Sequence, residues 1–200
     1  MFKVIKRLFD IIVSFLGLLI LSPLFLLLTI LIKCDSKGPV FFIQKRVGRN
    51  GKKFGIFKFR TMRINAEELI ASFTPEQLKE WKENFKLKND PRITRVGKFL
   101  RNTSLDELPQ LINIFIGNMS LVGPRPIVEE ELEWYGEKKS VLLSVRPGLT
   151  GWWATNGRSE VSYPERCDYE LYYVYNCSIL LDIKILFKTF SAVFSRKGAM

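Results

Sequence analysis

The sequence contains no histidine among its 200 residues. This absence excludes histidine-based catalytic triads, histidine general bases and histidine metal ligands. If the protein is an enzyme, carboxylates are therefore the leading candidates for its nucleophile, its base and its metal ligands. The sequence also shows no internal repeat and no low-complexity segment, so neither a repeat architecture nor a compositionally biased linker is expected.

Cysteine and acidic residues are both scarce. Cys34, Cys167 and Cys177 form no C-x-x-C pair, and their odd number predicts reduced thiols in a cytosolic catalytic domain. Lysine and arginine outnumber aspartate and glutamate by 31 to 20, which gives a net charge of +11. This balance favours anionic partners: nucleic acid, phosphorylated substrates or an acidic membrane surface. The length suits one domain with its own core.

Residues 11–32 form a long run without charge. A straight helix of this length would extend over about 33 Å, enough to cross a bilayer. However, Ser22 and Pro23 interrupt the run, and proline breaks or kinks a helix. Basic residues lie on both sides of the run: Lys3, Lys6 and Arg7 before it, and Lys33, Lys37, Lys45, Arg46 and Arg49 after it. Because positive residues mark the cytoplasmic side, this pattern leaves open a kinked span and a re-entrant helix pair. Either way, we expect the residues after 33 in the cytosol.

A β-hairpin is predicted next along the chain. Residues 40–44 are β-branched and aromatic, Asn50-Gly51 is typical of a hairpin turn, and residues 54–61 alternate over their second half. This alternation places Lys58 and Arg60 on one face of the strand, which is either a solvated face or an anion-binding one.

Two helices are also predicted. Thr74-Pro75-Glu76-Gln77 is typical of a capped helix start, and the helix should extend to about Lys88 at the periphery. Residues 179–194 are apolar at helical spacing with interleaved basic residues. Such a helix can lie in a membrane interface or pack on the domain core, and the pattern does not distinguish these.

The segment from Ser104 to Gln110 holds two adjacent carboxylates, Asp106 and Glu107. Ser104 and Glu107 have the spacing of a capping box, although Pro109 favours a helix start one or two residues later. With either start, the two carboxylates lie at the positive end of a helix, which should keep both ionised. The pair therefore reads either as a helix cap or as a nucleophile and a Mg²⁺ ligand.

Three turns each present an arginine: Gly123-Pro124-Arg125-Pro126, Arg146-Pro147-Gly148 and Asn156-Gly157-Arg158-Ser159. Arginine is the side chain best suited to bidentate phosphate binding, and proline makes the first turn rigid. Each turn, taken alone, is also an ordinary surface feature.

Taken together and in order, these motifs resemble the bacterial sugar transferases, the small monotopic polyprenyl-phosphate phosphoglycosyl transferases. The resemblance covers about 180 residues and is carried by joint order rather than by any one motif. The matching stretches are Lys6 to Asp10, Ser22-Pro23, Gly38 to Phe42, Lys58 to Met62, Arg101 to Gln110, Gly117 to Pro126, Arg146 to Gly151, Asn156 to Arg158 and Leu181 to Lys184.

The resemblance implies a fold, a location and a reaction. The fold would be α+β and mainly helical, with a small β-hairpin or sheet. Residues 1–33 would form a re-entrant membrane helix pair broken at Ser22 and Pro23, and residues 34–200 a cytosolic catalytic domain with a C-terminal interfacial helix. The enzyme would sit monotopically in the bacterial cytoplasmic membrane and transfer a sugar phosphate from a UDP-sugar to polyprenyl phosphate, releasing UMP. Mg²⁺ would be the cofactor, inner-membrane lipids would be partners, nucleic acid would not be one, and homo-oligomerisation stays open.

The resemblance also assigns residues. Asp106 would be the nucleophile, forming an aspartyl-phosphosugar, and Glu107 would bind the metal together with it. Phosphates would be bound by Arg101, Arg125, Lys58 and Arg60, with Asp182, Arg158, Pro124 and Pro126 in supporting roles. Asn118, where the family often has aspartate, and residues 153–155 depart from the family pattern without replacing a proposed catalytic residue. The stretch from Tyr163 to Arg166 looks more like members that transfer hexose phosphates.

The alternative function, from the net charge and the apolar run, is a membrane-anchored basic protein that binds nucleic acid or anionic lipid. The aromatic signatures of RNA-binding modules and zinc-ligand spacings are absent from the sequence, which favours the enzyme.

Overall fold

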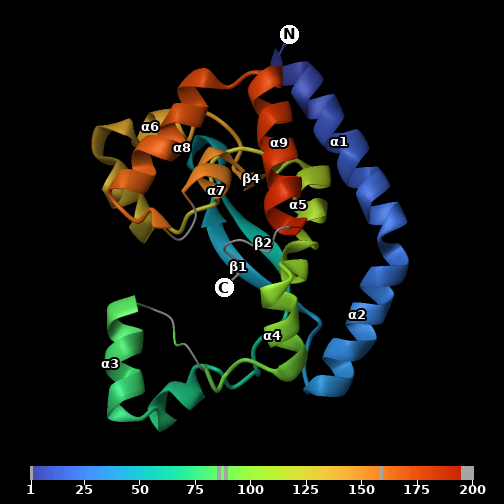
Figure 1. Ribbon diagram of the computed structural model, residues 1–200, viewed down its shortest axis with the longest axis vertical. Coiled ribbons are helices and arrows are strands. Elements are labelled where there is room, and N and C mark those ends of the chain that lie inside the picture. Colours follow the sequence, from blue (N-terminus) through green and yellow to red (C-terminus); the bar gives the residue numbers. More distant parts are fainter. Residues whose placement is uncertain (1, 85–86, 88–89, 158–159, 195–200) are drawn as a thin grey trace.

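The computed structural model describes residues 2–84, 87, 90–157 and 160–194 (Figure 1). The helices are α1 (Phe2–Ile20), α2 (Ser22–Asp35), α3 (Pro75–Asn84), α4 (Arg95–Asn102), α5 (Gln110–Ile116), α6 (Lys139–Leu142), α7 (Trp152–Asn156), α8 (Glu165–Asn176) and α9 (Ile179–Phe194). Two small sheets pair β1 (Phe41–Val47) with β2 (Lys53–Phe59), and β3 (Ser120–Val122) with β4 (Gly148–Thr150). The predicted class, mainly helical α+β with small sheets, is confirmed.

The N-terminal apolar run forms two helices rather than one. Helices α1 and α2 meet at Leu21 with a bend of 59°, and Pro23 occupies the first turn of α2, where its missing N–H costs no hydrogen bond. The Ser22 hydroxyl donates to the carbonyl of Leu19 at 2.7 Å. Among the described helices, none alone is long and apolar enough to cross a membrane, whereas this bent pair is by length and composition. The predicted break at Ser22-Pro23 is confirmed; insertion as a re-entrant pair stays a prediction.

Helix α1 is fastened to the rest of the domain by polar contacts. The buried carboxylate of Asp10 accepts hydrogen bonds from the Ser120 hydroxyl and the Leu121 amide, both at 3.0 Å. The Arg7 guanidinium donates to the carbonyls of Ile114 and Phe115 at the end of α5, where the last carbonyls lack a partner in the next helical turn. Figure 1 shows α1 lying along α5 and α9 on the outside of the molecule. Helices α1 and α2 therefore share hydrophobic clusters with the residues that follow.

The predicted hairpin is present. Strands β1 and β2 are antiparallel, with Phe41 opposite Phe59 and Val47 opposite Lys53. Asn50 and Gly51 both have positive φ, 57° and 74°, which the connecting turn requires and which asparagine and glycine tolerate best. Phe59 is buried against α2 and α4 in one of the hydrophobic clusters.

The second sheet pairs β3 with β4, two short segments for which no strand was predicted from the sequence. β3 and β4 are parallel, with Ser120 opposite Gly148 and Val122 opposite Thr150. The amide of Gly123 donates to the carbonyl of Thr150, so the Gly-Pro-Arg-Pro turn starts from the end of this sheet. Ile56, Ile114, Met119 and Val122 belong to the main core around it.

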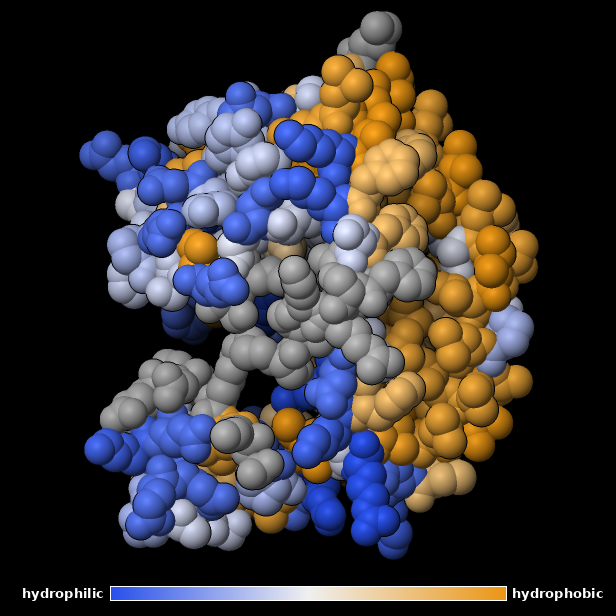
Figure 2. All heavy atoms as spheres, viewed as in Figure 1, coloured by the Kyte–Doolittle hydropathy of each residue, from blue (hydrophilic) through white to orange (hydrophobic). Residues whose placement is uncertain are grey.

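Helix α9 packs on the domain core with one face and exposes the other. Ile185 is fully buried and Leu181 and Leu186 pack on the main core. The opposite face exposes apolar side chains: Leu180 is 80% exposed, Phe187 73% and Phe190 65%. In Figure 2 apolar side chains gather over α1, α2 and α9 in one continuous surface. That this surface contacts a membrane stays a prediction.

Helix α3 begins as predicted. The Thr74 hydroxyl accepts from the Gln77 amide and the Gln77 side chain accepts from the Thr74 amide, which is a reciprocal capping box. The described helix ends at Asn84, and its predicted end near Lys88 lies outside the described residues. Figure 1 shows α3 standing out from the body of the molecule, at the periphery as expected.

Candidate functional site

The segment from Ser104 to Gln110 does not contain the predicted capping box. Ser104 has a left-handed conformation (φ 56°) and its side chain makes no cap hydrogen bond. Leu105–Glu107 form a 3-10 turn, and α5 begins at Gln110, directly after Pro109. The helix therefore starts later than either predicted start, because it begins only after Pro109. Asp106 and Glu107 lie one turn before it, and Glu107 is free of any capping role.

Helix α4 brings an arginine to this turn. Gly97 packs so closely on the end of β2 that an added Cβ would meet the Thr61 carbonyl oxygen at 2.1 Å. This close approach lets the Arg101 Nε donate to the Thr61 hydroxyl at 2.9 Å. Arg101 is thereby held near Asp106, where its positive charge opposes the other influences that raise the pKa of this carboxyl.

The two carboxylates have opposite pKa shifts. Burial and then the charge of Glu107 raise the pKa of Asp106 to about 6, against the opposing charges of Lys58 and Arg101. For Glu107 burial also raises the pKa, but the Lys58 ammonium, which donates to Glu107 Oε1 at 2.8 Å, outweighs it and lowers the pKa below its usual value. The surroundings therefore favour the predicted ionised form of Glu107. They disfavour that of Asp106, although its pKa stays below neutral pH.

A pocket of about 450 Å³, partly open to solvent, adjoins these carboxylates. Lys58, Glu107 and Gln110 form one side of it and the turn at Arg125 another, whereas Asp106 lies beside Glu107 just outside the lining. Pro124 and Pro126 are buried and hold the exposed Arg125 between them. The remaining lining residues are Arg46, Ile56, Gly123, Pro126, Gly148, Leu149, Thr150, Gly151, Trp153, Ala154 and Glu170.

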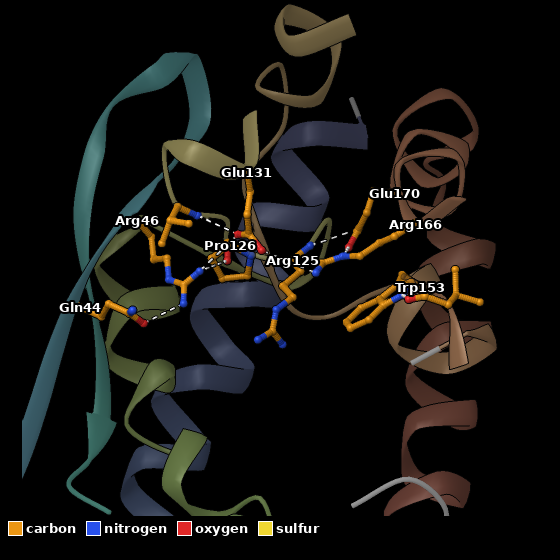
Figure 3. Close-up of polar contacts among 10 residues, drawn as sticks. Gln44, Arg46, Arg125, Pro126, Glu131, Trp153, Arg166 and Glu170 are labelled. Atoms are coloured by element: carbon orange, nitrogen blue, oxygen red, sulfur yellow. Dashed lines mark hydrogen bonds and ion pairs between the residues drawn. The ribbon is translucent and has the colours of Figure 1, made fainter. Parts of the chain in front are cut away.

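Buried polar side chains support the Arg125 turn from both sides (Figure 3). The Arg46 guanidinium donates to the carbonyl of Pro126 at 3.2 Å and lies 3.5 Å from the Glu131 carboxylate. On the other side, Glu170 Oε2 accepts from the Arg125 amide at 3.1 Å. Among the described residues, no carboxylate forms an ion pair with the Arg125 guanidinium, which points away from both supports. Its charge is therefore available to a ligand.

Sequence reasoning missed Glu170, Arg166 and Arg46 as parts of this site. Burial raises the pKa of Glu170 to about 7. Its Oε1 lies 3.7 Å from Arg166 Nε, too far for a hydrogen bond, and within the described part of the chain both atoms lack another partner. The Arg166 guanidinium lies 4.2 Å from the ring centre of Trp153. The available signal was the i, i+4 spacing of Arg166 and Glu170, which is too common to single them out.

Two predicted residues are placed elsewhere. The buried Arg60 guanidinium donates to the carbonyls of Ser36, Lys37 and Ile32, and so closes the end of α2 rather than facing the pocket. Asp182 accepts from Lys6 at 2.6 Å and from the Tyr173 hydroxyl at 2.7 Å, which ties α9 to α1. Arg158, a predicted supporting residue, lies outside the described residues.

The described residues contain no cluster of three or more metal-ligating side chains. Asp106 and Glu107 supply two adjacent carboxylates. Such a pair fits Mg²⁺, which binds through one or two carboxylates and completes its octahedron with water and substrate phosphates.

Comparison with known proteins identifies the class of protein that contains this carboxylate pair and its adjoining pocket. The chain belongs to the bacterial sugar transferase family, whose model matches residues 1–196.

Three relatives indicate the range of this family. The chain is 47% identical over 197 residues to the exopolysaccharide production protein ExoY of Sinorhizobium fredii, covering 97% of this chain and 87% of ExoY. It is 48% identical to the undecaprenyl-phosphate galactose phosphotransferase of Salmonella typhimurium, covering 98% of this chain and 42% of that one. It is 43% identical to the UDP-glucose:undecaprenyl-phosphate glucose-1-phosphate transferase of Klebsiella pneumoniae, covering 98% of this chain and 41% of that one. The chain thus spans about two fifths of the length of several curated relatives.

Proposed function

We propose that this protein transfers a hexose 1-phosphate from a UDP-sugar to polyprenyl phosphate and releases UMP. The observation that supports this most is the Asp106–Glu107 pair, held by Lys58 and Arg101 beside a cationic pocket. The names of the Salmonella and Klebsiella relatives give undecaprenyl phosphate as acceptor and galactose or glucose as the sugar.

Asp106 is the proposed nucleophile. One of its carboxylate oxygens attacks the sugar-bearing phosphorus of the donor, a P–O bond forms, and the P–O bond of the anhydride breaks with its electron pair leaving on UMP. An oxygen of polyprenyl phosphate then attacks the same phosphorus and displaces the Asp106 carboxylate. With a pKa of about 6, Asp106 is mostly ionised at neutral pH, so no general base is needed in a chain without histidine.

The positive side chains fit the charge that this reaction moves. Phosphoryl transfer depends on positioning and on neutralising the phosphate oxygens. Arg125 is free to bind the donor phosphates, whereas Lys58 orients Glu107. Trp153 lines the pocket with the Arg166 guanidinium against its ring, and offers an aromatic surface to the nucleotide.

Mg²⁺ is proposed as the cofactor, bound by Glu107 and Asp106 together with donor phosphates. When bound, it would withdraw charge from the phosphate oxygens and polarise the anhydride.

We also propose that the protein lies in the bacterial cytoplasmic membrane with its pocket on the cytosolic side. The bend between α1 and α2 and the apolar surface over α1, α2 and α9 support a re-entrant, monotopic arrangement. Half-insertion would let one site reach both a soluble donor and a lipid-borne phosphate.

The decisive experiment measures UMP release from UDP-sugars in the absence of polyprenyl phosphate. We expect release of about one equivalent per enzyme and then a stop, with the mass of a phosphosugar on the peptide that holds Asp106. Asp106→Asn should bind the donor and release no UMP, because an amide of similar shape is a poor nucleophile. Asp168→Asn, at an exposed position of α8, is the matched control and should behave as wild type. UMP release and labelling in Asp106→Asn would assign the nucleophile elsewhere.

The alternative function, a basic binding protein for nucleic acid or anionic lipid, is less well supported. The relatives are named as transferases, which favours an enzyme. UMP release that depends on a UDP-sugar separates the two functions, because a binding protein releases none.

A further inference from the structure

A second cavity lies at the opposite end of the β3–β4 sheet from the Arg125 pocket. Its volume is about 510 Å³, which includes open solvent at its mouth, and it shares no lining residue with that pocket. Its walls come from the first turns of α1, the hairpin turn, β3 and the segment before β4. Its lining residues are Phe2, Lys3, Lys6, Arg7, Asp10, Arg49, Ser120, Val122, Ser144, Val145, Arg146, Tyr173 and Cys177.

The charge of this cavity is strongly positive. Lys3, Lys6, Arg7, Arg49 and Arg146 line it, against the single carboxylate of Asp10. Asp10 is already used as the acceptor for the Ser120 hydroxyl and the Leu121 amide. Burial, and after it the charges of Arg7 and Arg49, lowers the pKa of Arg146. Cations held together without a counter-charge destabilise one another, and a bound anion would relieve this repulsion.

Some of these cations are committed to the fold and others are free. Lys6 pairs with Asp182, and Arg7 donates to the two carbonyls at the end of α5. Lys3, by contrast, has no hydrogen-bond or ion-pair partner among the described residues. The Nε of Arg49 is buried and likewise lacks a hydrogen-bond partner in the described part of the chain. Lys3 is exposed, so its ammonium is free to reach a ligand. A buried donor left without an acceptor is costly, so the Nε of Arg49 points to a missing anionic ligand.

We infer that this cavity binds the phosphate of an anionic phospholipid headgroup. The source is a lipid because the same turns of α1 that line the cavity expose apolar side chains beside it. Val4 is 64% exposed, Ile5 43% and Leu8 56%, and they belong to the apolar surface that would lie in the membrane. A phospholipid whose headgroup phosphate lies in the cavity would have its acyl chains along the apolar side of α1. The inference rests on the membrane association proposed above and not on the proposed catalytic step.

The test uses the full chain in neutral detergent micelles, titrated with phosphatidylglycerol or phosphatidylcholine and monitored by native mass spectrometry. We expect one phosphatidylglycerol retained per protein and no comparable retention of phosphatidylcholine. The double variant Lys3→Gln/Arg49→Gln should weaken phosphatidylglycerol binding roughly tenfold to hundredfold, because it removes charge-assisted hydrogen bonds to phosphate. Lys52→Gln/Lys98→Gln is the matched control: it removes the same charge from exposed positions outside the cavity and should bind like wild type.

The remaining outcomes distinguish the alternatives. Unchanged phosphatidylglycerol binding in Lys3→Gln/Arg49→Gln would overturn the inference. Equal retention of the two lipids, together with binding of inorganic phosphate that this double variant loses, would also overturn it, by assigning the cavity to a soluble phosphate. Failure of membrane association would show separately, as release of the wild-type protein from membranes by alkaline carbonate. Because UMP release is measured in detergent with soluble donor, it tests the catalytic proposal independently.

Discussion

Asp106 must be ionised to attack phosphorus, yet its surroundings penalise its negative charge. Burial and Glu107 raise its pKa to about 6, while Lys58 and Arg101 oppose them. We therefore expect the rate of UMP release in a single turnover to fall about tenfold per pH unit below pH 6. Glu107→Gln removes a like charge and should shift the midpoint of this profile downward, whereas Lys58→Gln should shift it upward. Midpoints that stay fixed in both variants would mean that another group controls the rate.

The same pKa has a consequence for stability. A carboxyl whose pKa is raised in the folded state stabilises the fold at low pH and loses this contribution as pH rises through about 6. Asp106→Asn removes a charge that the fold penalises at alkaline pH. Thermal unfolding near pH 8 should therefore show a higher Tm for Asp106→Asn than for wild type, and the difference should shrink below pH 6. A lower Tm at pH 8 would contradict the raised pKa.

Arg125 is held rigidly and its charge is unpaired, which suits it to bind the donor phosphates. Arg125→Lys keeps the charge and loses the bidentate fork. We expect kcat/KM to fall roughly tenfold to a thousandfold, equivalent to about 1.4–4 kcal/mol. Arg95→Lys, at an exposed position of α4, is the matched control and should leave kcat/KM unchanged. Near-normal activity of Arg125→Ala would assign this arginine to the fold alone.

Residue type and spacing in the sequence predicted some residues of the site, but not those whose role depends on tertiary packing. Lys58 and Arg60 are both basic and were predicted on the same strand face, so the sequence does not distinguish them. In the structure, Lys58 binds Glu107, whereas Arg60 donates to the carbonyls at the end of α2. The difference depends on which helix end lies over each side chain, and that is a tertiary property. Glu170 is likewise recognisable only once α8 is packed behind the Arg125 turn.

At the scale of elements, α4 positions Arg101 through a glycine. Alanine normally stabilises a helix relative to glycine by about 1 kcal/mol. At Gly97, however, the added methyl would meet the Thr61 backbone at 2.1 Å, and a backbone cannot yield as a flexible side chain does. Gly97→Ala should therefore lower the stability by roughly 1–3 kcal/mol and reduce activity with it.

The control for this change is Gly17→Ala in α1. There the added methyl would meet only a Leu111 side-chain carbon at 3.2 Å, which can shift by a few tenths of an ångström. Thermal unfolding of both variants in the same detergent makes the comparison. A Gly97→Ala protein as stable as Gly17→Ala would show that the approach of α4 to Thr61 is looser than the structure indicates.

The bend between α1 and α2 is the second element-scale feature with a testable consequence. Replacing Ser22 with leucine and Pro23 with alanine removes the helix break and should favour one straight helix long enough to cross the bilayer. In a cysteine-free background, Lys3→Cys should then label from outside intact cells with a membrane-impermeant maleimide. With Ser22 and Pro23 retained, the same cysteine should label only after the cells are opened. Outside labelling with the native break would refute the re-entrant arrangement and leave the enzymatic proposal intact.

Local patterns predicted the elements whose interactions are local. The hairpin at Asn50-Gly51, the capped start of α3 and the break at Pro23 depend on neighbouring residues, and all three are present. The parallel pairing of β3 with β4 joins residues far apart in the chain and was not predicted. The capping box at Ser104 failed because Pro109 delays α5 and the intervening turn leaves Ser104 in a left-handed conformation.

At the scale of the whole molecule, α9 forms both part of the core and part of the apolar surface. Phe187 belongs only to the surface, because it is 73% exposed while Ile185 in the same helix is fully buried. An environment-sensitive fluorophore on Phe187→Cys, in a cysteine-free protein reconstituted into nanodiscs, should therefore be quenched strongly by lipids with brominated acyl chains. The same fluorophore on Lys79→Cys, on the peripheral and polar helix α3, should be quenched little. Thermal stability in detergent should be unchanged by Phe187→Cys, since no core contact is lost. Equal, weak quenching at both positions would remove α9 from the membrane interface and confine the insertion to α1 and α2.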